Sequence, residues 1–221
     1  MRVVMIHALA ESIPPVRVAF QDEFPEAEVI NLLDEGLLID FPGAITPSLR
    51  RRMSDLICYS QDNSADAIGL ACSVYAPVVD SARDLVDVPL VSSYGPVMQE
   101  AVAAGPRVGV IATNNATMTD SEYYLNLAAQ EAGSEIKAGR EIKVVKRLAS
   151  DLIQVLRENG QSAFEKRLEE ETLALAPDVD VVLLSQFSFA TALDHLRRVS
   201  PIPVLSAPHC SARALKKMLE A

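Results

Sequence analysis

The sequence predicts an α/β protein composed of two pseudo-symmetric halves, each a four-stranded parallel sheet with helices on both faces. Two observations lead to this prediction. Short, continuous apolar runs alternate with segments of helical spacing along the whole chain, and such runs are typical of strands buried on both faces of a sheet. Several of these runs also recur in the second half of the chain, in the same order.

In the first half, the strand-like runs cover residues 2–7, 27–32, 67–71 and 88–91. Helices are expected to begin at Pro14, after Thr46 and at Pro77, because proline is favoured in the first turn of a helix and threonine can cap its start. Residues 34–46 contain two glycines and a proline and show no clear period, so an irregular loop is expected there.

The second half repeats this alternation with longer helices. The segments expected there are a helix from Pro96 to Gly105, a strand at 107–113, a long helix ending at Gly133, a weak strand at 135–138, helices around 148–156 and 164–175 split by Asn159-Gly160, strands at 180–184 and 202–206, and a final helix from Pro208.

The repeated runs indicate an internal duplication. Residues 107–113 resemble 2–8, residues 180–188 resemble the run from 66 that ends in Cys72-Ser73, and 202–206 resemble 88–92. We therefore expect one half, formed by residues 1–94 with 208–221, to carry Cys72, and the other, residues 95–207, to carry Gln186. Each half would have a flavodoxin-like sheet. Ligands bind beyond the carboxyl ends of parallel strands, so a cleft between the halves is expected.

Charge and composition narrow the possible functions. The net charge of −10 disfavours nucleic acid and anionic membrane surfaces as partners. No apolar run approaches the roughly 20 residues of a membrane span, and the N-terminus lacks a signal-peptide pattern. The three cysteines fit neither a disulfide framework nor a metal-binding spacing, and there is no glycine-rich phosphate loop. These observations predict a cytoplasmic protein without a metal or cofactor.

Polar side chains at the predicted strand ends are the candidates for chemistry: His7, Cys72 with Ser73, Thr113 with Asn114, and Ser185 with Gln186. Cys72 stands between a strand and a helix, where backbone N–H groups can lower the pKa of a thiol. Structural roles are open for each of them. A cysteine can fill a buried strand end, a histidine can be hydrogen-bonded at a sheet edge, and Thr or Asn can cap a helix.

Three further residues have simpler interpretations. Cys58 lies beside the apolar stripe of a predicted helix and is expected to fill the core. His195 is expected on a solvated helix face. His209 and Cys210 begin the last helix, where packing is the simpler explanation, although His209 could approach the rim of the cleft.

The strand end Leu70-Ala71-Cys72-Ser73, the stretch Gly109–Thr113 and the second strand end at 184–188 resemble the aspartate/glutamate/hydantoin racemase superfamily. This resemblance implies an isomerase that acts on a small carboxylate without pyridoxal phosphate or metal, and a dimer or larger homo-oligomer. In the family, two cysteines exchange the proton alpha to the carboxylate. Cys72 matches the first of these, Ser73 and Val74 follow it as substrate-binding positions, and Thr113 and Asn114 match a second binding turn.

The chain departs from the family at the second cysteine, where the usual Gly-Cys-Thr reads Ser185-Gln186-Phe187. Glutamine has no titratable proton near neutral pH. A branch resembling arylmalonate decarboxylase works with one cysteine, but it keeps the second and lacks the first. Three interpretations stay open: a racemase-type enzyme with Cys72 as acid/base, a one-thiol decarboxylase or isomerase, and a non-catalytic protein that binds a small acid. His7, His209 and the residues at 185–187 are further substrate-binding candidates.

Overall fold

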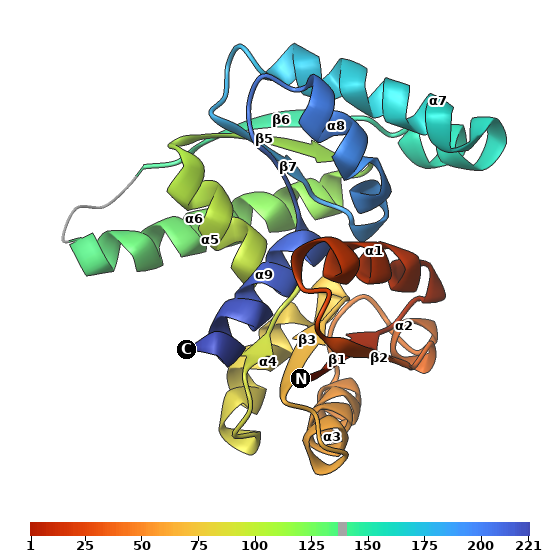
Figure 1. The fold of residues 1–221 in the computed structure, drawn as a ribbon, viewed down its shortest axis with the longest axis vertical. Coiled ribbons are helices and arrows are strands. Elements are labelled where there is room, and N and C mark those ends of the chain that lie inside the picture. Colours follow the sequence, from red (N-terminus) through yellow and green to blue (C-terminus); the bar gives the residue numbers. More distant parts are fainter. Residues whose placement is uncertain (137–140) are drawn as a thin grey trace. The chain divides into compact units, whose positions relative to one another are not determined.

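The protein is described by a computed structural model covering residues 1–136 and 141–221. It forms two compact units. Unit 1 comprises Met1–Pro96 and Pro208–Ala221, and unit 2 comprises Val97–Ala207. Each unit contains one four-stranded parallel sheet surrounded by helices (Figure 1). The predicted fold class, two parallel four-stranded sheets with helices around them, is confirmed.

The sheet of unit 1 has the strand order β2-β1-β3-β4. Its strands are β1 (Arg2–His7), β2 (Glu28–Leu33), β3 (Ala67–Leu70) and β4 (Leu90–Val91). The central strands β1 and β3 are almost entirely buried, in keeping with their continuous apolar sequences. Ile6 of β1 pairs in register with Leu70 of β3, so the carboxyl ends of these two strands lie side by side.

The helices of unit 1 are α1 (Ile13–Glu23), α2 (Gly36–Ile39), α3 (Pro47–Asp62), α4 (Ala76–Ala82) and α9 (Ala207–Glu220), with single 3-10 turns η1 (Ala10–Ser12), η2 (Ser73–Tyr75) and η3 (Arg83–Leu85). Thr46 caps α3 as predicted: its hydroxyl accepts a hydrogen bond from the Leu49 N–H at 3.2 Å. The short helix α2 lies in the segment that was expected to be an irregular loop.

The C-terminal helix α9 is held by charged pairs to the end of α1 and to the residues that follow it. Arg213 pairs with Glu23, and Lys216 pairs with Glu26 at 3.3 Å. Lys216 also lies 5.6 Å from the centre of the Phe24 ring. These contacts explain why a helix at the far end of the sequence belongs to the first unit.

The sheet of unit 2 repeats the order, as β6-β5-β7-β8. Its elements are the strands β5 (Arg107–Ala112), β6 (Lys143–Leu148), β7 (Val181–Leu184) and β8 (Val204–Ser206), the helices α5 (Gly95–Ala104), α6 (Asn115–Ile136), α7 (Leu152–Leu175) and α8 (Leu193–Val199), and the 3-10 helix η4 (Phe187–Ala192). Gly160 interrupts α7 with a φ of +81°, at the break that the sequence predicted.

Equivalent contacts recur in the two sheets. The backbone N–H of Arg2 donates to the Asp66 carboxylate at 2.6 Å, and that of Arg107 donates to the Asp180 carboxylate at 2.9 Å. Asp66 and Asp180 each precede the third strand of their sheet. The same strand order and the same arginine–aspartate contact support an internal duplication.

The second strand of unit 2 lies at a different place from the one predicted. Residues 135–136 belong to α6, which continues past Gly133, and residues 137–138 lie outside the described residues. The strand is β6, at Lys143–Leu148, and α7 begins only at Leu152. β6 is an edge strand with three basic residues and mostly exposed or half-buried positions, so it lacks the apolar run that marks the other strands.

Candidate active site

Cys72 lies two residues beyond the carboxyl end of β3 and immediately precedes the turn η2. The backbone N–H groups of Val74 and Tyr75 hydrogen-bond to its thiolate and so lower the pKa of the thiol. Burial acts in the opposite direction and outweighs them, so the pKa of Cys72 is raised above its ordinary value of 9.0. The helix start therefore does supply the expected N–H donors, but the resting group is a protonated thiol.

His7 ends the neighbouring strand β1 and is completely buried. Its Nδ1 atom lies 2.5 Å from the Ser12 hydroxyl, and its Nε2 atom lies 2.9 Å from the Asn31 side-chain oxygen. Burial is the main reason why the pKa of His7 is lowered to about 4, so the imidazole is neutral at pH 7. With a partner on each ring nitrogen, His7 ties the end of β1 to η1 and β2.

The other predicted site residues of unit 1 lie in two different parts of the unit. Ser73 and Val74 are half-buried in η2, immediately after Cys72. His209 lies on α9 instead, only 1% exposed, with its Nε2 atom 3.2 Å from the Asp22 carboxylate of α1. The Cys210 sulfur accepts a hydrogen bond from the Arg213 guanidinium at 3.2 Å. The structure thus places His209 and Cys210 in the packing of α9 on α1.

In unit 2, Gln186 occupies the position that Cys72 holds in unit 1: it follows the third strand and begins a 3-10 helix. Its amide makes two hydrogen bonds to Thr113, at the end of β5. The Thr113 N–H donates to Gln186 Oε1 at 3.1 Å, and Gln186 Nε2 donates to the Thr113 hydroxyl at 2.7 Å. The turn that contains Thr113 and the turn that contains Gln186, both predicted to bind substrate, are therefore joined by direct hydrogen bonds.

The other candidates of unit 2 have local partners. The Asn114 side-chain oxygen accepts from the Thr117 N–H at 2.9 Å and so caps the start of α6. The Ser185 hydroxyl donates to the Ile111 carbonyl oxygen at 2.6 Å. Phe187 is half-buried in η4. His195, expected on a solvated face, is half-buried and lies 2.6 Å from the Glu169 carboxylate.

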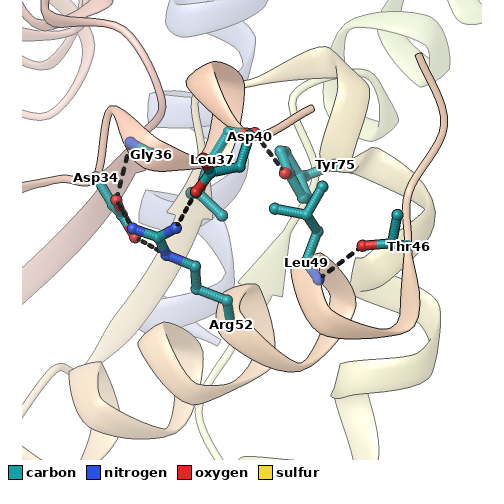
Figure 2. Close-up of polar contacts among 8 residues, drawn as sticks. All are labelled: Asp34, Gly36, Leu37, Asp40, Thr46, Leu49, Arg52 and Tyr75. Atoms are coloured by element: carbon teal, nitrogen blue, oxygen red, sulfur yellow. Dashed lines mark hydrogen bonds and ion pairs between the residues drawn. The ribbon is translucent and has the colours of Figure 1, made fainter. Parts of the chain in front are cut away.

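Two sets of residues near Cys72 and His7 were missed by the sequence analysis. Ser12 and Asn31 are the partners of His7. Asn31 could have been noticed, because it is a polar residue inside the apolar strand β2. The other set surrounds Tyr75, whose hydroxyl donates to the Leu37 carbonyl oxygen at 2.6 Å (Figure 2). No sequence pattern joins these two residues, which are 38 positions apart.

Within residues 1–136 and 141–221, no cluster of three or more His, Cys, Asp or Glu side chains could hold a metal ion. In the same ranges, no helix combines the length and the apolar character that crossing a membrane requires.

Comparison with known proteins decides the family. Residues 41–185, more than half of the chain, match the family described as Asp/Glu/Hydantoin racemase. The chain belongs to this family. Membership supports an enzyme of the isomerase class and disfavours the interpretation as a non-catalytic binding protein. No curated protein sequence matches the chain.

Solved structures agree on the fold of this racemase-family enzyme. An aspartate racemase homologue from Pyrococcus horikoshii matches with a TM-score of 0.75 and 15% identity, over 100% of this chain and 99% of the other. Allantoin racemase from Klebsiella pneumoniae matches with a TM-score of 0.70 and 15% identity, over 100% of this chain and 88% of the other. A glycine-to-cysteine mutant of arylmalonate decarboxylase matches with a TM-score of 0.67 and 16% identity, over 100% of this chain and 94% of the other. At these identities the likeness establishes the fold alone.

Proposed function

We propose that the enzyme performs acid/base chemistry at the carbon alpha to a small carboxylate, without a cofactor, and that Cys72 is the group that transfers the proton. The observation that carries this proposal is a thiol at the carboxyl end of β3 with the N–H groups of Val74 and Tyr75 on its sulfur. Related proteins named aspartate and glutamate racemases indicate this type of substrate.

The chemistry requires a proton donor or acceptor at one carbon and hydrogen-bond donors for the charge that forms. When the Cys72 thiol gives its proton to a carbanion, the sulfur becomes negative. The N–H groups of Val74 and Tyr75 then face an anion, which they stabilise more strongly than a neutral thiol. Ser73 is the adjacent residue in the same turn and is proposed to bind the substrate.

The test is exchange of the alpha proton in D2O, followed by proton NMR, with a panel of small carboxylates that includes aspartate and glutamate. Allantoin, whose exchangeable C–H stands beside a ring carbonyl instead of a carboxylate, is added as a further candidate. The wild-type enzyme should exchange at least one of them. A Cys58→Ser variant should behave like wild type, because Cys58 lies in the last turns of α3, the end of the helix that leads into the start of β3. Absence of exchange and turnover across the panel would overturn the proposal.

A second candidate reaction is protonation of one face only, as in a decarboxylase or a one-base isomerase. Two observations favour it. Gln186, which has no titratable proton near neutral pH, stands at the position equivalent to Cys72. The raised pKa of Cys72 also makes its resting form a proton donor.

The configuration of the product separates the two candidates. A malonate bearing two different substituents is a suitable substrate, because loss of carbon dioxide and protonation by Cys72 would create one stereocentre. One-face protonation should give a single enantiomer on a chiral column, whereas a racemic product would exclude it.

Three further properties complete the proposal: a cytoplasmic location, no cofactor, and assembly as a dimer or larger homo-oligomer. Light scattering of the purified protein measures the assembly directly. Unchanged activity after dialysis against a chelator and a carbonyl reagent would agree with chemistry that needs neither metal nor pyridoxal phosphate.

A further inference from the structure

Tyr75 connects the Cys72 turn to another part of unit 1. Its backbone N–H donates to the Cys72 carbonyl oxygen at 3.3 Å and also hydrogen-bonds to the thiolate. Its side chain is completely buried, and its hydroxyl donates to the Leu37 carbonyl oxygen of α2 at 2.6 Å (Figure 2). One residue thus contacts Cys72 through its backbone and α2 through its side chain.

The segment that Tyr75 holds, residues 34–41, is fixed from its other side by Arg52 of α3. The Arg52 guanidinium binds both carboxylate oxygens of Asp34, each at 2.6 Å, and reaches Asp40 at 3.0 Å (Figure 2). The Asp34 carboxylate also accepts the Gly36 N–H at 3.1 Å. A bidentate pair of this kind fixes orientation as well as distance. We call these contacts of Arg52 the Arg52 clasp.

Gly36 is needed for the close approach of Arg52. A Cβ atom at this position would lie 2.4 Å from Arg52 Nη2 and 2.9 Å from Cζ. Because these atoms end a flexible, half-exposed side chain, a side chain at position 36 would displace the guanidinium from Asp34 and leave the backbone in place.

The clasped segment and the Cys72 turn pack on the same core. Leu37 and Tyr75 are fully buried in it, and Phe41, Cys72 and Val74 pack against it from partly buried positions. Burial, and next the Cys72 charge, raise the pKa of Tyr75, and the charges of Arg52, Asp34 and Asp40 act on it as well. The Tyr75 hydroxyl therefore stays protonated and available as a donor to Leu37.

We propose that Tyr75 is a positioning residue, which fastens the clasped segment 34–41 beside Cys72 so that this segment shields the thiol from solvent and holds the η2 turn in place. The Arg52 clasp keeps the segment rigid from the other side. The consequences for catalysis rest on the proposed role of Cys72, whereas the consequences for thiol exposure do not.

The test measures alkylation of Cys72 by iodoacetamide as a function of pH, read by mass spectrometry on the peptide that contains Cys72. In Tyr75→Phe the Leu37 carbonyl loses its donor and the segment loosens. Burial is the main cause of the raised Cys72 pKa, so this pKa should fall toward its ordinary value and alkylation at pH 8 should rise by at least about threefold. Arg52→Met and Gly36→Ala should act in the same direction.

Matched controls use neighbours without these contacts. Tyr59→Phe changes an exposed tyrosine of α3, and Arg51→Met changes the exposed arginine beside Arg52. Both should keep the wild-type alkylation profile. If Tyr75→Phe does not fold, Gly36→Ala alters the clasp without touching the core and carries the test alone.

A folded Tyr75→Phe variant with the wild-type rate–pH profile at Cys72 would overturn the proposal. Where that variant does not fold, a folded Gly36→Ala variant with the wild-type profile would overturn it. For an active enzyme, the variants should also lower kcat/KM, because the η2 turn that follows Cys72 and contains Ser73 is held less firmly. Alkylation requires no substrate, so a protein without the proposed activity would still show the predicted change at Cys72. The two proposals therefore fail separately.

Discussion

The side chain of Gln186 is joined to Thr113 by two hydrogen bonds, one in each direction, at 3.1 Å and 2.7 Å. This pair links the ends of β5 and β7 and fixes the amide in one orientation. Glutamine can donate and accept hydrogen bonds at this position, but it supplies no proton for acid/base chemistry. If the enzyme uses a single thiol, the identity of residue 186 should decide how many faces of the substrate are protonated.

Gln186→Cys should convert single-face protonation into two-face chemistry. The family resemblance assigns the second acid/base thiol to this position, so the variant should give a racemic product where the wild type gives one enantiomer. Loss of the hydrogen bonds to Thr113 should lower the free energy of unfolding by about 1–2 kcal/mol. Chiral chromatography measures the first effect and urea unfolding the second. Gln186→Ser, which also removes the amide but adds no thiol, should keep the product enantiopure.

His7 should make stability depend on pH in the acid range. Its pKa is about 4 in the folded protein and 6.5 ordinarily, so the unfolded chain binds a proton that the folded protein excludes. Between pH 6.5 and 4, stability therefore falls as pH falls, by up to about 3 kcal/mol from this residue. Urea unfolding of wild type and His7→Gln across that range measures it.

The informative quantity is the difference in unfolding free energy between wild type and His7→Gln at each pH. Carboxylates in ion pairs also lose stabilising charge in acid, and this loss is common to both proteins. The variant should be less stable at pH 7, where Ser12 and Asn31 lose their partner, and its stability should decline less steeply toward pH 4. Parallel stability curves for the two proteins would contradict a buried neutral His7.

The C-terminal helix should contribute to the stability of unit 1 through Arg213. This side chain is 29% exposed and its partner Glu23 is 17% exposed, so the pair is partly shielded from water. Arg213→Met should destabilise the protein by about 1–3 kcal/mol, because the contacts of the Arg213 guanidinium with Glu23 and with the Cys210 sulfur are lost. Lys217→Met, at an exposed position of the same helix, should change the midpoint of thermal unfolding little. Equal effects of the two changes would contradict this account of how α9 is held.

The sequence was sufficient for the central strands and the positions at their ends. β1, β3, β5 and β7 are buried apolar runs, and such runs are visible without a structure. Once the strands are located in the sequence, the residues that follow them are known as well. Cys72 and Gln186 were therefore recognised as equivalent positions after the third strand of each sheet. The edge strand β6 was misplaced, since an exposed strand carries charged residues and lacks that signal.

Side-chain partners were much harder to foresee. Tyr75 and Leu37 meet because α2 folds back onto the Cys72 turn, and their contact runs from a hydroxyl to a backbone oxygen, which constrains no residue type at position 37. The direction of the Cys72 pKa also escaped prediction. The N–H donors follow from local structure, but burial depends on residues distant in the sequence, and burial is the larger effect.

The most direct test of the central claim compares single cysteine variants in one assay. Alpha-proton exchange in D2O would be measured for the wild type, Cys72→Ser, Cys58→Ser and Cys210→Ser on the best substrate found in the panel. If Cys72 transfers the proton, Cys72→Ser should lose at least about a hundredfold in exchange rate, while the folded Cys58→Ser and Cys210→Ser variants should keep it. A folded Cys72→Ser variant that exchanges at the wild-type rate would contradict the account.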